Sequence, residues 1–190
     1  MRGLVDRLGG VVLDLDSYYV DRSALPPEER SRLNYDEPAA IDAALLVEHL
    51  TRLGRGEPVP KPVYAFPTHE RIGAETVSPA PVVIVEGLFT LWWEALRSRL
   101  NVKVFVDASA DLRLIRRVRR DVTERARTVD QVLHQYLTTV RPMHERYVEP
   151  TRVHADLVVM NDGPVQDAVE HVIAAMRGRE ADGLAATVAH

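Results

Sequence analysis

The 190-residue sequence contains no cysteine. This absence excludes disulfide frameworks, cysteine-based zinc sites and thiol nucleophiles, and it fits a reducing cytoplasm, where we expect the protein to act. No apolar run approaches the ~18 residues that a membrane span needs, and the first residues lack the pattern of a secretory signal. We therefore expect neither secretion nor association with a membrane.

Positive charge is not in excess, since 24 Lys and Arg residues stand against 28 Asp and Glu residues, for a net charge of -4. This balance argues against a general nucleic-acid binder. With 46% hydrophobic residues, a chain of this size buries about two thirds of its unfolded surface and needs no structural metal. We expect a single domain over residues 1–178 and a disordered tail over residues 179–190.

Short β-branched runs alternate with amphipathic stretches along the chain. The runs predict strands over residues 11–15, 82–85, 102–106 and 157–160. The amphipathic stretches predict helices over residues 26–29, 38–54, 92–100, 109–120, 129–148 and 165–176. The proline-rich residues 58–81 predict a projecting β-hairpin. This alternation is typical of an α/β domain with a mostly parallel sheet flanked by helices.

Two acidic residues follow predicted strands, Asp16 after the first and Glu86 after the second. Ligands of open parallel sheets bind at the carboxyl ends of the strands, so these carboxylates would share one edge. There they could hold a divalent cation and orient a hydroxyl nucleophile, as phosphoryl transfer requires. The alternative is that each acid only caps a helix or forms a turn.

Arginines are concentrated between residues 113 and 127, where seven occur among few acids. Because the guanidinium group stays charged and donates paired hydrogen bonds, the series favours a polyphosphate partner. Two alternatives are a basic helix face tied by intrahelical ion pairs and, less in keeping with the net charge, a nucleic-acid groove. The series consists of Arg113, Arg116, Arg117, Arg119, Arg120, Arg125 and Arg127.

The predicted hairpin carries four planar or hydrogen-bonding side chains: Tyr64, Phe66, His69 and Arg71. Together they could stack on and read a flat ring, although a lone histidine in a loop is more often a surface residue. Asp36, which lies before the helix predicted to start at Pro38, could bind sugar hydroxyls or cap that helix.

In their order and spacing, these segments resemble the uridine kinase (uridine-cytidine kinase) family, within the phosphoribulokinase and uridine kinase group of P-loop kinases. The resemblance covers about residues 10 to 175. It rests on residues 16–19 (Asp-Ser-Tyr-Tyr), 34–38 (Asn-Tyr-Asp-Glu-Pro), 62–66 (Pro-Val-Tyr-Ala-Phe) with His69 and Arg71, 86–87 (Glu-Gly), 116–121 (Arg-Arg-Val-Arg-Arg-Asp), 124–127 (Glu-Arg-Ala-Arg), 135–136 (Gln-Tyr), 141–142 (Arg-Pro) and 147–156.

The resemblance implies a P-loop kinase-like fold with an arginine-rich helical lid. It implies transfer of a phosphoryl group from ATP or GTP, with Mg²⁺, to the 5′-hydroxyl of uridine or cytidine, and it implies a homotetramer. Two other functions stay open. One is a catalytically dead nucleoside- or nucleotide-binding paralogue. The other is a related kinase for another hydroxyl acceptor, such as pantothenate or ribulose 5-phosphate.

The resemblance also assigns roles to individual residues. Asp16 would accept the 5′-hydroxyl proton, and Glu86 would lie near Mg²⁺, with water between them. Arg120 and Arg125 would belong to a lid that closes over the phosphates. Asp36 would hold the ribose hydroxyls, and the pyrimidine edge would be read from the hairpin. The full set of implied substrate-binding residues is Tyr19, Asp36, Tyr64, His69, Arg117, Arg127 and Gln135.

The sequence departs from the family pattern in two places. Ala126 stands where the family usually has glycine between the two lid arginines, and no Gly-x-x-x-x-Gly-Lys-Ser/Thr motif occurs in the 190 residues. About 20 to 25 residues of a strand-loop-helix unit would precede residue 1 in the family. We expect the functional protein to be longer and the chain as given to be inactive or weakly active. The competing hypothesis is a short paralogue without catalysis.

Without that first strand, the parallel sheet would lack a central member. The strands on either side would then keep unpaired backbone groups or close up on each other.

Overall fold

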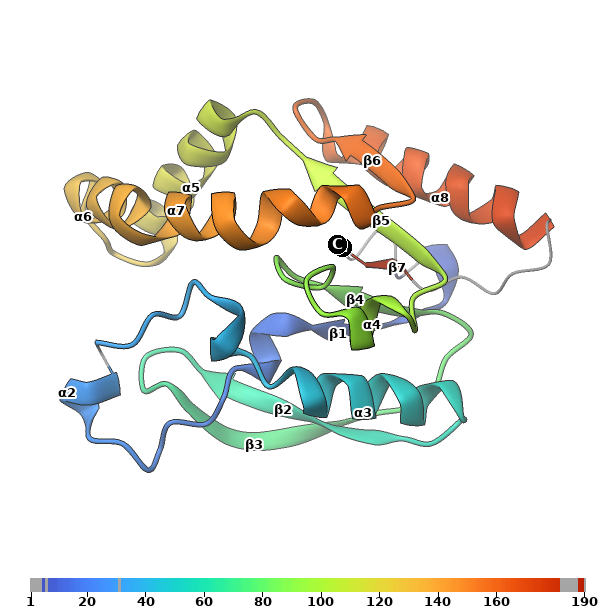
Figure 1. The fold of residues 1–190 in the computed structure, drawn as a ribbon, viewed down its shortest axis with the longest axis horizontal. Helices are drawn as coiled ribbons and strands as arrows, with labels where there is room; N and C mark the ends of the chain where they lie inside the picture. Colours follow the sequence, from blue (N-terminus) through green and yellow to red (C-terminus); the bar gives the residue numbers. More distant parts are fainter. Residues whose placement is uncertain (1–4, 6, 31, 182–187, 190) are drawn as a thin grey trace.

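The computed structural model describes residues 5, 7–30, 32–181 and 188–189, and Figure 1 shows how they are arranged. The strands are β1 (Val11–Asp14), β2 (Val59–Ala65), β3 (Glu70–Val77), β4 (Val83–Glu86), β5 (Val102–Asp107), β6 (Leu157–Met160) and β7 (Val188–Ala189). The helices are α2 (Pro27–Arg30), α3 (Ala43–Gly54), α4 (Glu94–Arg97), α5 (Ala110–Glu124), α6 (Val129–Gln135), α7 (Arg141–Met143) and α8 (Val165–Ala181).

Five strands form a central sheet in the order β1-β4-β7-β5-β6, and every neighbouring pair is parallel. The parallel sheet flanked by helices confirms the expected α/β fold. The β-branched runs form these strands because such side chains pack well on a pleated surface that is buried on both faces.

The strands on either side of the expected gap, β4 and β5, neither stay unpaired nor close up on each other, because another strand lies between them. β7 lies between β4 and β5, where its residues 188 and 189 pair with Ile84 and Val85 on one side and with Val102 and Lys103 on the other. A strand of two residues leaves no recognisable pattern in a sequence, because periodicity needs a longer segment. Of the predicted tail, residues 182–187 and 190 lie outside the described residues, and α8 continues through residue 181.

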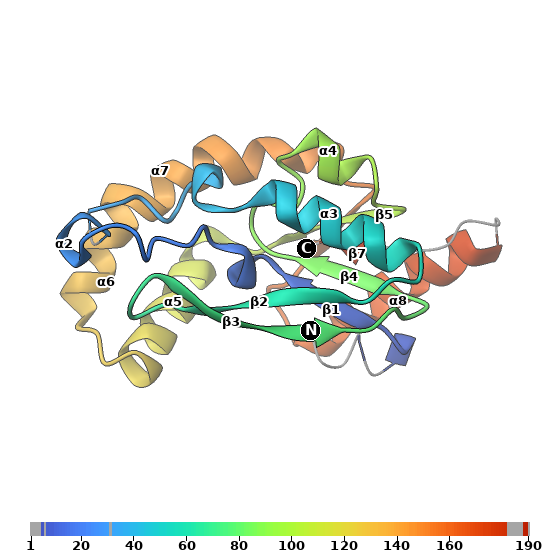
Figure 2. The same cartoon turned by 90° about the horizontal axis from the view of Figure 1, so that it is seen from below.

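The predicted hairpin is present as the antiparallel pair β2 and β3, with a register shift between Val63 and Tyr64. Lys61 of β2 connects the hairpin to the central sheet, since its Nζ lies 2.7 Å from Oδ2 of Asp14 in β1. The same Nζ lies 2.9 Å from Oε1 of Glu75 in β3, within the hairpin. The turn of the hairpin lies at the same end of the molecule as α2 and α6 (Figures 1 and 2).

Two helix predictions are corrected by the structure. The helix predicted from Pro38 begins at Ala43, because Ile41 is extended and Asp42 caps α3 by accepting a hydrogen bond from the Leu45 N–H. The predicted helix over residues 129–148 has two π-helical segments, 136–140 and 144–148, on either side of α7. Such segments are frequent at functional sites and have no simple sequence pattern.

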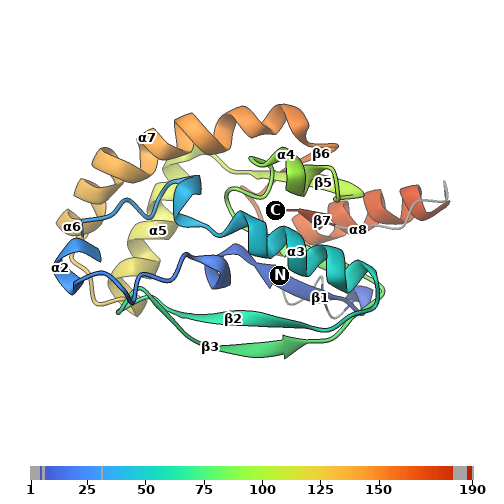
Figure 3. The ribbon, with the colours of Figure 1, turned by 60° about the horizontal axis from the view of Figure 1, so that its bottom comes forward.

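Apolar side chains form two clusters on opposite sides of the sheet. One joins β1 and β4 to α3 through residues such as Leu13, Leu46 and Val85. The other joins β5 and β6 to α8 through residues such as Val104 and Ile173. Figure 3 shows α3 and α8 in these positions. Within the described residues, no helix is long and apolar enough to cross a membrane.

Gly87, which directly follows β4, has a positive φ of 140°. A Cβ atom at this position would lie 2.5 Å from Leu15 Cβ. Only glycine therefore lets the chain turn here, next to the carboxyl ends of β1 and β4.

We expect Gly87→Ala to lower the free energy of unfolding by about 2–4 kcal/mol, because it adds backbone strain to an overpacked contact. Urea unfolding measures this change. Gly73→Ala is the matched control, since Gly73 has no positive φ and a methyl group added there would meet no atom within 4 Å. Equal stability of the two variants would contradict the prediction.

Candidate functional site

Three carboxylates gather at the carboxyl ends of β1 and β4. The parallel register places Asp14 opposite Glu86, and Asp16 follows in the 3-10 turn Leu15–Tyr18. The turn forms because Asp14 accepts hydrogen bonds from the backbone N–H and the hydroxyl of Ser17. The structure therefore brings the two predicted acids to one edge of the sheet, as expected.

The pKa values of these carboxyl groups differ because their partners differ. Burial raises the pKa of Asp14, but hydrogen bonds from Lys61 and Ser17 outweigh it and hold the pKa below its ordinary value. The pKa of Asp16 is raised first by desolvation among the surrounding protein atoms and then by the charge of Asp14, although part of the residue is exposed to solvent. Burial and the charge of Asp14 also raise the pKa of Glu86. The site thus holds one carboxylate that is more acidic than usual, Asp14, and two that are more basic than usual, Asp16 and Glu86.

Aromatic rings from three segments meet beside these acids. The Tyr19 and Tyr64 ring centroids are 5.1 Å apart, and the Tyr35 ring is stacked on His69 with the centroids 4.1 Å apart. The hydroxyl of Tyr64 and Nδ1 of His69 are buried and have no hydrogen-bond partner among the described residues. Since buried polar atoms are almost always paired, these two atoms are available to a ligand.

Four of the predicted substrate-binding side chains share one hydrogen-bond network. Gln135 Oε1 accepts from Arg117 at 3.0 Å and from Arg127 at 2.7 Å, and Gln135 Nε2 donates to Asp36 at 3.5 Å. Thr139 also donates to Asp36, at 3.1 Å. The N-cap position of the turn that starts at Pro38 is occupied by Glu37, which makes no side-chain capping hydrogen bond, and not by Asp36, so the capping alternative for Asp36 is wrong.

Asp121 organises the arginine series from a fully buried position. Its carboxylate lies 2.7 Å from Arg120, 3.3 Å from Arg127, 3.5 Å from Arg125 and 3.8 Å from Arg117. Burial raises the pKa of Asp121, but the hydrogen bond and charge of Arg120 and the other guanidinium groups hold it below the ordinary value. The alternative of intrahelical ion pairs is therefore part of the structure, but one carboxylate balances only one of these four positive charges.

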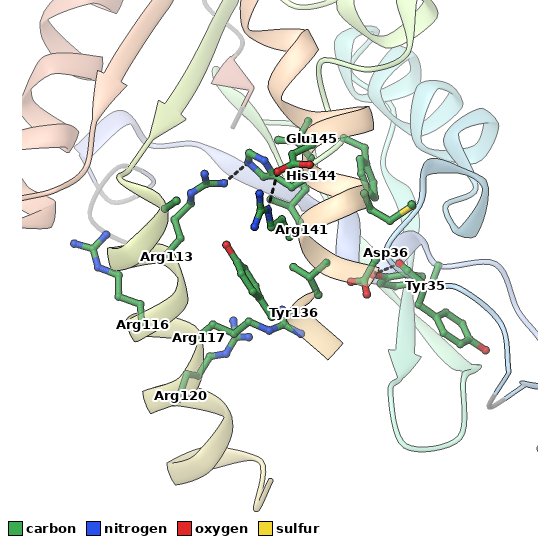
Figure 4. A pocket seen from close by; sticks show the side chains of 17 residues that line it. Tyr35, Asp36, Arg113, Arg116, Arg117, Arg120, Tyr136, Arg141, His144 and Glu145 are labelled. Atoms are coloured by element: carbon green, nitrogen blue, oxygen red, sulfur yellow. Dashed lines mark hydrogen bonds and ion pairs between the residues drawn. The ribbon is translucent and has the colours of Figure 1, made fainter. Parts of the chain in front are cut away.

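A cavity of about 750 Å³ opens between α5 and the segment 136–148 (Figure 4). Four predicted residues line it: Tyr19, Asp36, Arg117 and Arg120. The other predicted residues do not line the cavity itself, but Gln135 and Arg127 contact members of its wall, and Tyr64 packs on Tyr19. Two more predicted residues, Asp16 and Glu86, lie at the sheet edge described above. His69 lies in the turn of the hairpin, and Arg125 lies beside Asp121.

Several residues of the site were given no role from the sequence, although Tyr35 and Arg141 lie in segments that carry the family resemblance. Thr139, Tyr35 and Lys61 contact predicted residues, and the cavity also contains Arg141 and His144. Arg71, which was grouped with the ring-reading side chains, instead donates to the Tyr19 carbonyl at 3.0 Å and contacts Asp42 at 3.2 Å. It therefore holds the hairpin against the first turn after β1.

The acids at the sheet edge fit a magnesium ion of the kind that binds with phosphates. Among the described residues, no three acidic, histidine or cysteine side chains are placed so that together they could hold a metal ion. Mg²⁺, however, keeps several waters and uses one or two carboxylates beside substrate phosphates. Asp14 is engaged by Lys61, so Asp16 and Glu86 are the carboxylates left for such a role.

The sequence is similar to uridine kinases over most of its length. It is 45% identical to the uridine kinase of Geobacillus kaustophilus (strain HTA426) over 180 residues, covering 93% of this chain and 85% of that protein. It is 47% identical to the uridine kinase of Chloroflexus aggregans (strain MD-66 / DSM 9485) over 163 residues, covering 85% of this chain and 78% of that one.

Solved structures show the same fold at low sequence identity. Phosphoribulokinase from Rhodobacter spheroides superposes with a TM-score of 0.59 at 15% identity, over 84% of this chain and 63% of that chain. A possible uridine kinase from Bacillus stearothermophilus gives a TM-score of 0.57 at 16% identity, over 83% and 78%. The model of the Phosphoribulokinase / Uridine kinase family matches residues 10–168. With this match and the sequence identity above, the chain belongs to the phosphoribulokinase and uridine kinase family.

Proposed function

We propose that this protein is a uridine kinase that transfers the γ-phosphoryl group of ATP to the 5′-hydroxyl of uridine or cytidine. The proposal includes a cytoplasmic location and a homotetramer, as in the family that it resembles. The relatives at 45–47% identity are named uridine kinases, and this favours the pyrimidine nucleoside over pantothenate or ribulose 5-phosphate as acceptor.

One observation carries the choice of substrate. The buried Tyr64 hydroxyl and His69 Nδ1 have no partner among the described residues, and they lie beside Tyr19 and Tyr35. Uracil offers a carbonyl and cytosine offers an amine at the same edge of a flat ring. A hydroxyl and an imidazole nitrogen can donate to the first or accept from the second.

The ribose would lie against the network around Asp36. A carboxylate accepts hydrogen bonds from sugar hydroxyls, and Gln135 and Thr139 hold the Asp36 carboxylate in place. The adjacent guanidinium groups of Arg117 and Arg127 are fixed through Gln135. The nucleoside is thereby oriented before the reaction, which lowers the entropic part of the barrier.

Asp16 is the residue that we assign to the 5′-hydroxyl. The nucleoside oxygen forms a bond to the γ-phosphorus, the bond to the β,γ-bridging oxygen breaks, and the hydroxyl proton passes to the Asp16 carboxylate. The products are a nucleoside 5′-monophosphate and ADP. The raised pKa of Asp16 suits this role, because a more basic carboxylate accepts a proton more readily.

Arg120 and Arg125 would approach the phosphates from the lid, since both are exposed and anchored on Asp121. Glu86 would hold Mg²⁺ through water. When bound, Mg²⁺ neutralises charge on the phosphate oxygens. Because no phosphate-loop motif occurs in these residues, we expect the 190-residue chain to bind ATP weakly and to turn over slowly.

The proposal is tested by incubating the chain with radiolabelled uridine, ATP and Mg²⁺ and separating the products. Formation of uridine 5′-monophosphate, even slowly, supports it. Uridine binding without any product would favour a non-catalytic paralogue. Phosphorylation of pantothenate or ribulose 5-phosphate in preference to uridine would favour the other kinase function.

Asp16→Asn should lower the turnover number by about 10²–10⁴-fold while changing the uridine dissociation constant far less, because proton transfer occurs only near the transition state. Steady-state kinetics and calorimetric titration measure the two quantities. Asp167→Asn is the control, since Asp167 is exposed in the first turn of α8, which packs on β5 and β6. A loss of binding as large as the loss of turnover would contradict the role of Asp16.

The pH profile should reflect the raised pKa of Asp16. The base must be deprotonated, so kcat/KM should fall as the pH drops through a pKa higher than that of an ordinary aspartate. Asp14→Asn removes a negative neighbour, lowers the pKa of Asp16 and should move the acidic limb to lower pH. Glu75→Gln, which touches Lys61 but is not among the charges acting on Asp16, should leave the limb in place. A shift to higher pH in Asp14→Asn would refute the assignment.

Tyr64→Phe should weaken uridine binding by about tenfold while leaving stability unchanged or higher, because the hydroxyl that it removes has no partner among the described residues. Calorimetric titration and thermal unfolding measure the two effects. Tyr18→Phe is the reverse control, since the buried Tyr18 hydroxyl lies 3.0 Å from His49 Nδ1. That variant should lose stability and keep uridine affinity. Unchanged affinity in Tyr64→Phe would count against the base-reading hairpin.

A further inference from the structure

Arg113 and His144, to which no role has been assigned so far, meet at the wall of the cavity. Arg113 lies in the first turns of α5, and His144 begins the second π-helical segment. The Arg113 Nη1 and the His144 Nε2 are in hydrogen-bond contact, and Figure 4 shows this contact facing into the cavity.

The Arg113 guanidinium lacks a carboxylate partner. Further along α5, Arg117 and Arg120 are paired with Asp121, but no acidic side chain of the described residues forms an ion pair with Arg113. The Nε atom of Arg113 is buried and has no hydrogen-bond partner among the residues that the structure describes. A half-buried positive charge with free donors is costly unless an anion is present.

The acids whose charges act on His144, namely Glu145, Asp107 and Glu149, are already engaged with other groups. Glu145, on the same segment as His144, accepts from Arg141 at 2.8 Å, and Asp107 at the end of β5 accepts from Arg152 at 2.6 Å. Glu149 lies 3.8 Å from Arg152. The positive charge of Arg113 therefore remains available to a ligand rather than being neutralised within the protein.

His144 serves as an acceptor for Arg113 in this arrangement. Burial lowers the pKa of His144 and the neighbouring Arg113 lowers it further, against the opposing charges of Glu149, Asp107 and Glu145. A neutral imidazole can accept at Nε2 from a guanidinium group, whereas an imidazolium cannot. The contact thus fixes the direction of the guanidinium without removing its charge.

The geometry points to a phosphate-binding subsite in which Arg113 contacts the anion and His144 is a positioning residue that holds Arg113 toward the cavity. Arg113, Arg116, Arg117 and Arg120 recur with helical spacing along one wall of the cavity, over about 10 Å of α5. Arg113, Arg116 and Arg120 of this row are spaced to contact successive phosphates of one chain, whereas Arg117 stays in the network around Asp36 through Gln135. The shared ligand chemistry is a phosphate group, carried by the nucleotide donor or by the monophosphate product. Only this choice of carrier rests on the proposed function.

The test measures binding of inorganic tripolyphosphate to the 190-residue chain by calorimetric titration at fixed ionic strength, without nucleoside. Arg113→Ala should weaken binding by about tenfold, the effect of losing a charge-assisted pair of hydrogen bonds. Arg113→Lys, which keeps the charge without the planar fork, should show a partial loss. Arg146→Ala is the charge-matched control, because Arg146 is exposed, lies over the Tyr147 ring and is not part of the cavity wall. It should change affinity by less than about twofold.

The positioning role of His144 is tested with a conservative pair of variants. His144→Gln keeps an acceptor for Arg113 and should bind tripolyphosphate nearly as the unmodified chain does. His144→Leu removes the acceptor and should weaken binding severalfold at unchanged thermal stability. Equal affinities of the two variants would overturn this role, since a packing role alone would not be rescued by a polar side chain.

The carrier of the phosphate is distinguished by repeating the titrations with uridine 5′-monophosphate. A loss in Arg113→Ala for tripolyphosphate alone assigns the subsite to the donor, and a loss for the monophosphate alone assigns it to the product. Equal losses in Arg113→Ala and Arg146→Ala, or no binding of either anion to the unmodified chain, would overturn the subsite. Uridine phosphorylation is measured separately, so failure of the subsite and failure of the proposed kinase activity are distinguishable.

Discussion

The parallel pairing of β1 with β4 is the constraint on which the site depends. It sets Asp14 opposite Glu86 and brings Asp16 to the same edge. The pairing also forces the chain to leave β4 through Gly87, because any side chain there would meet Leu15. Lys61 joins the hairpin to this edge through its salt bridge with Asp14. The positions of Tyr64 and His69, which we propose read the base, are thus tied to the same two strands as the carboxylates.

The arginine series depends on a different interaction, the burial of the Asp121 carboxylate among four guanidinium groups. Asp121 could not remain ionised in a fully buried position without them, and the arginines could not lie so close together without it. The cluster keeps a net positive charge and holds it beside the cavity. The same ion network thus provides both ion pairs and an unbalanced positive charge, so the ion-pair interpretation of the arginine series does not exclude the proposed phosphate contacts.

The sequence predicted those features that depend on neighbouring residues. β-branched runs located β1, β4, β5 and β6, and the acids at the ends of β1 and β4 could be placed because parallel strands end together. Contacts between distant residues could not be predicted in this way. Gln135 meets Asp36 across 99 positions, and the insertion of β7 and the contact of Arg113 with His144 follow only from the assembled fold. The start of α3 was predicted too early because a tertiary bridge between Tyr19 and Ile41 overrides the proline signal.

Two residues other than glycine adopt a left-handed backbone among those described, His69 with a φ of 56° and Ala126 with a φ of 51°. This conformation costs an L-residue about 1–2 kcal/mol. One lies in the hairpin turn and the other between the lid arginines, so both strained positions belong to segments that would contact the proposed substrate. A strained residue keeps such a conformation only where its surroundings hold it in place. The ring of Tyr35 stacked on His69, and the ion pairs of Arg125 and Arg127 with Asp121 on either side of Ala126, supply that hold. The cost of these two turns is therefore met by neighbouring contacts and not by the turns themselves.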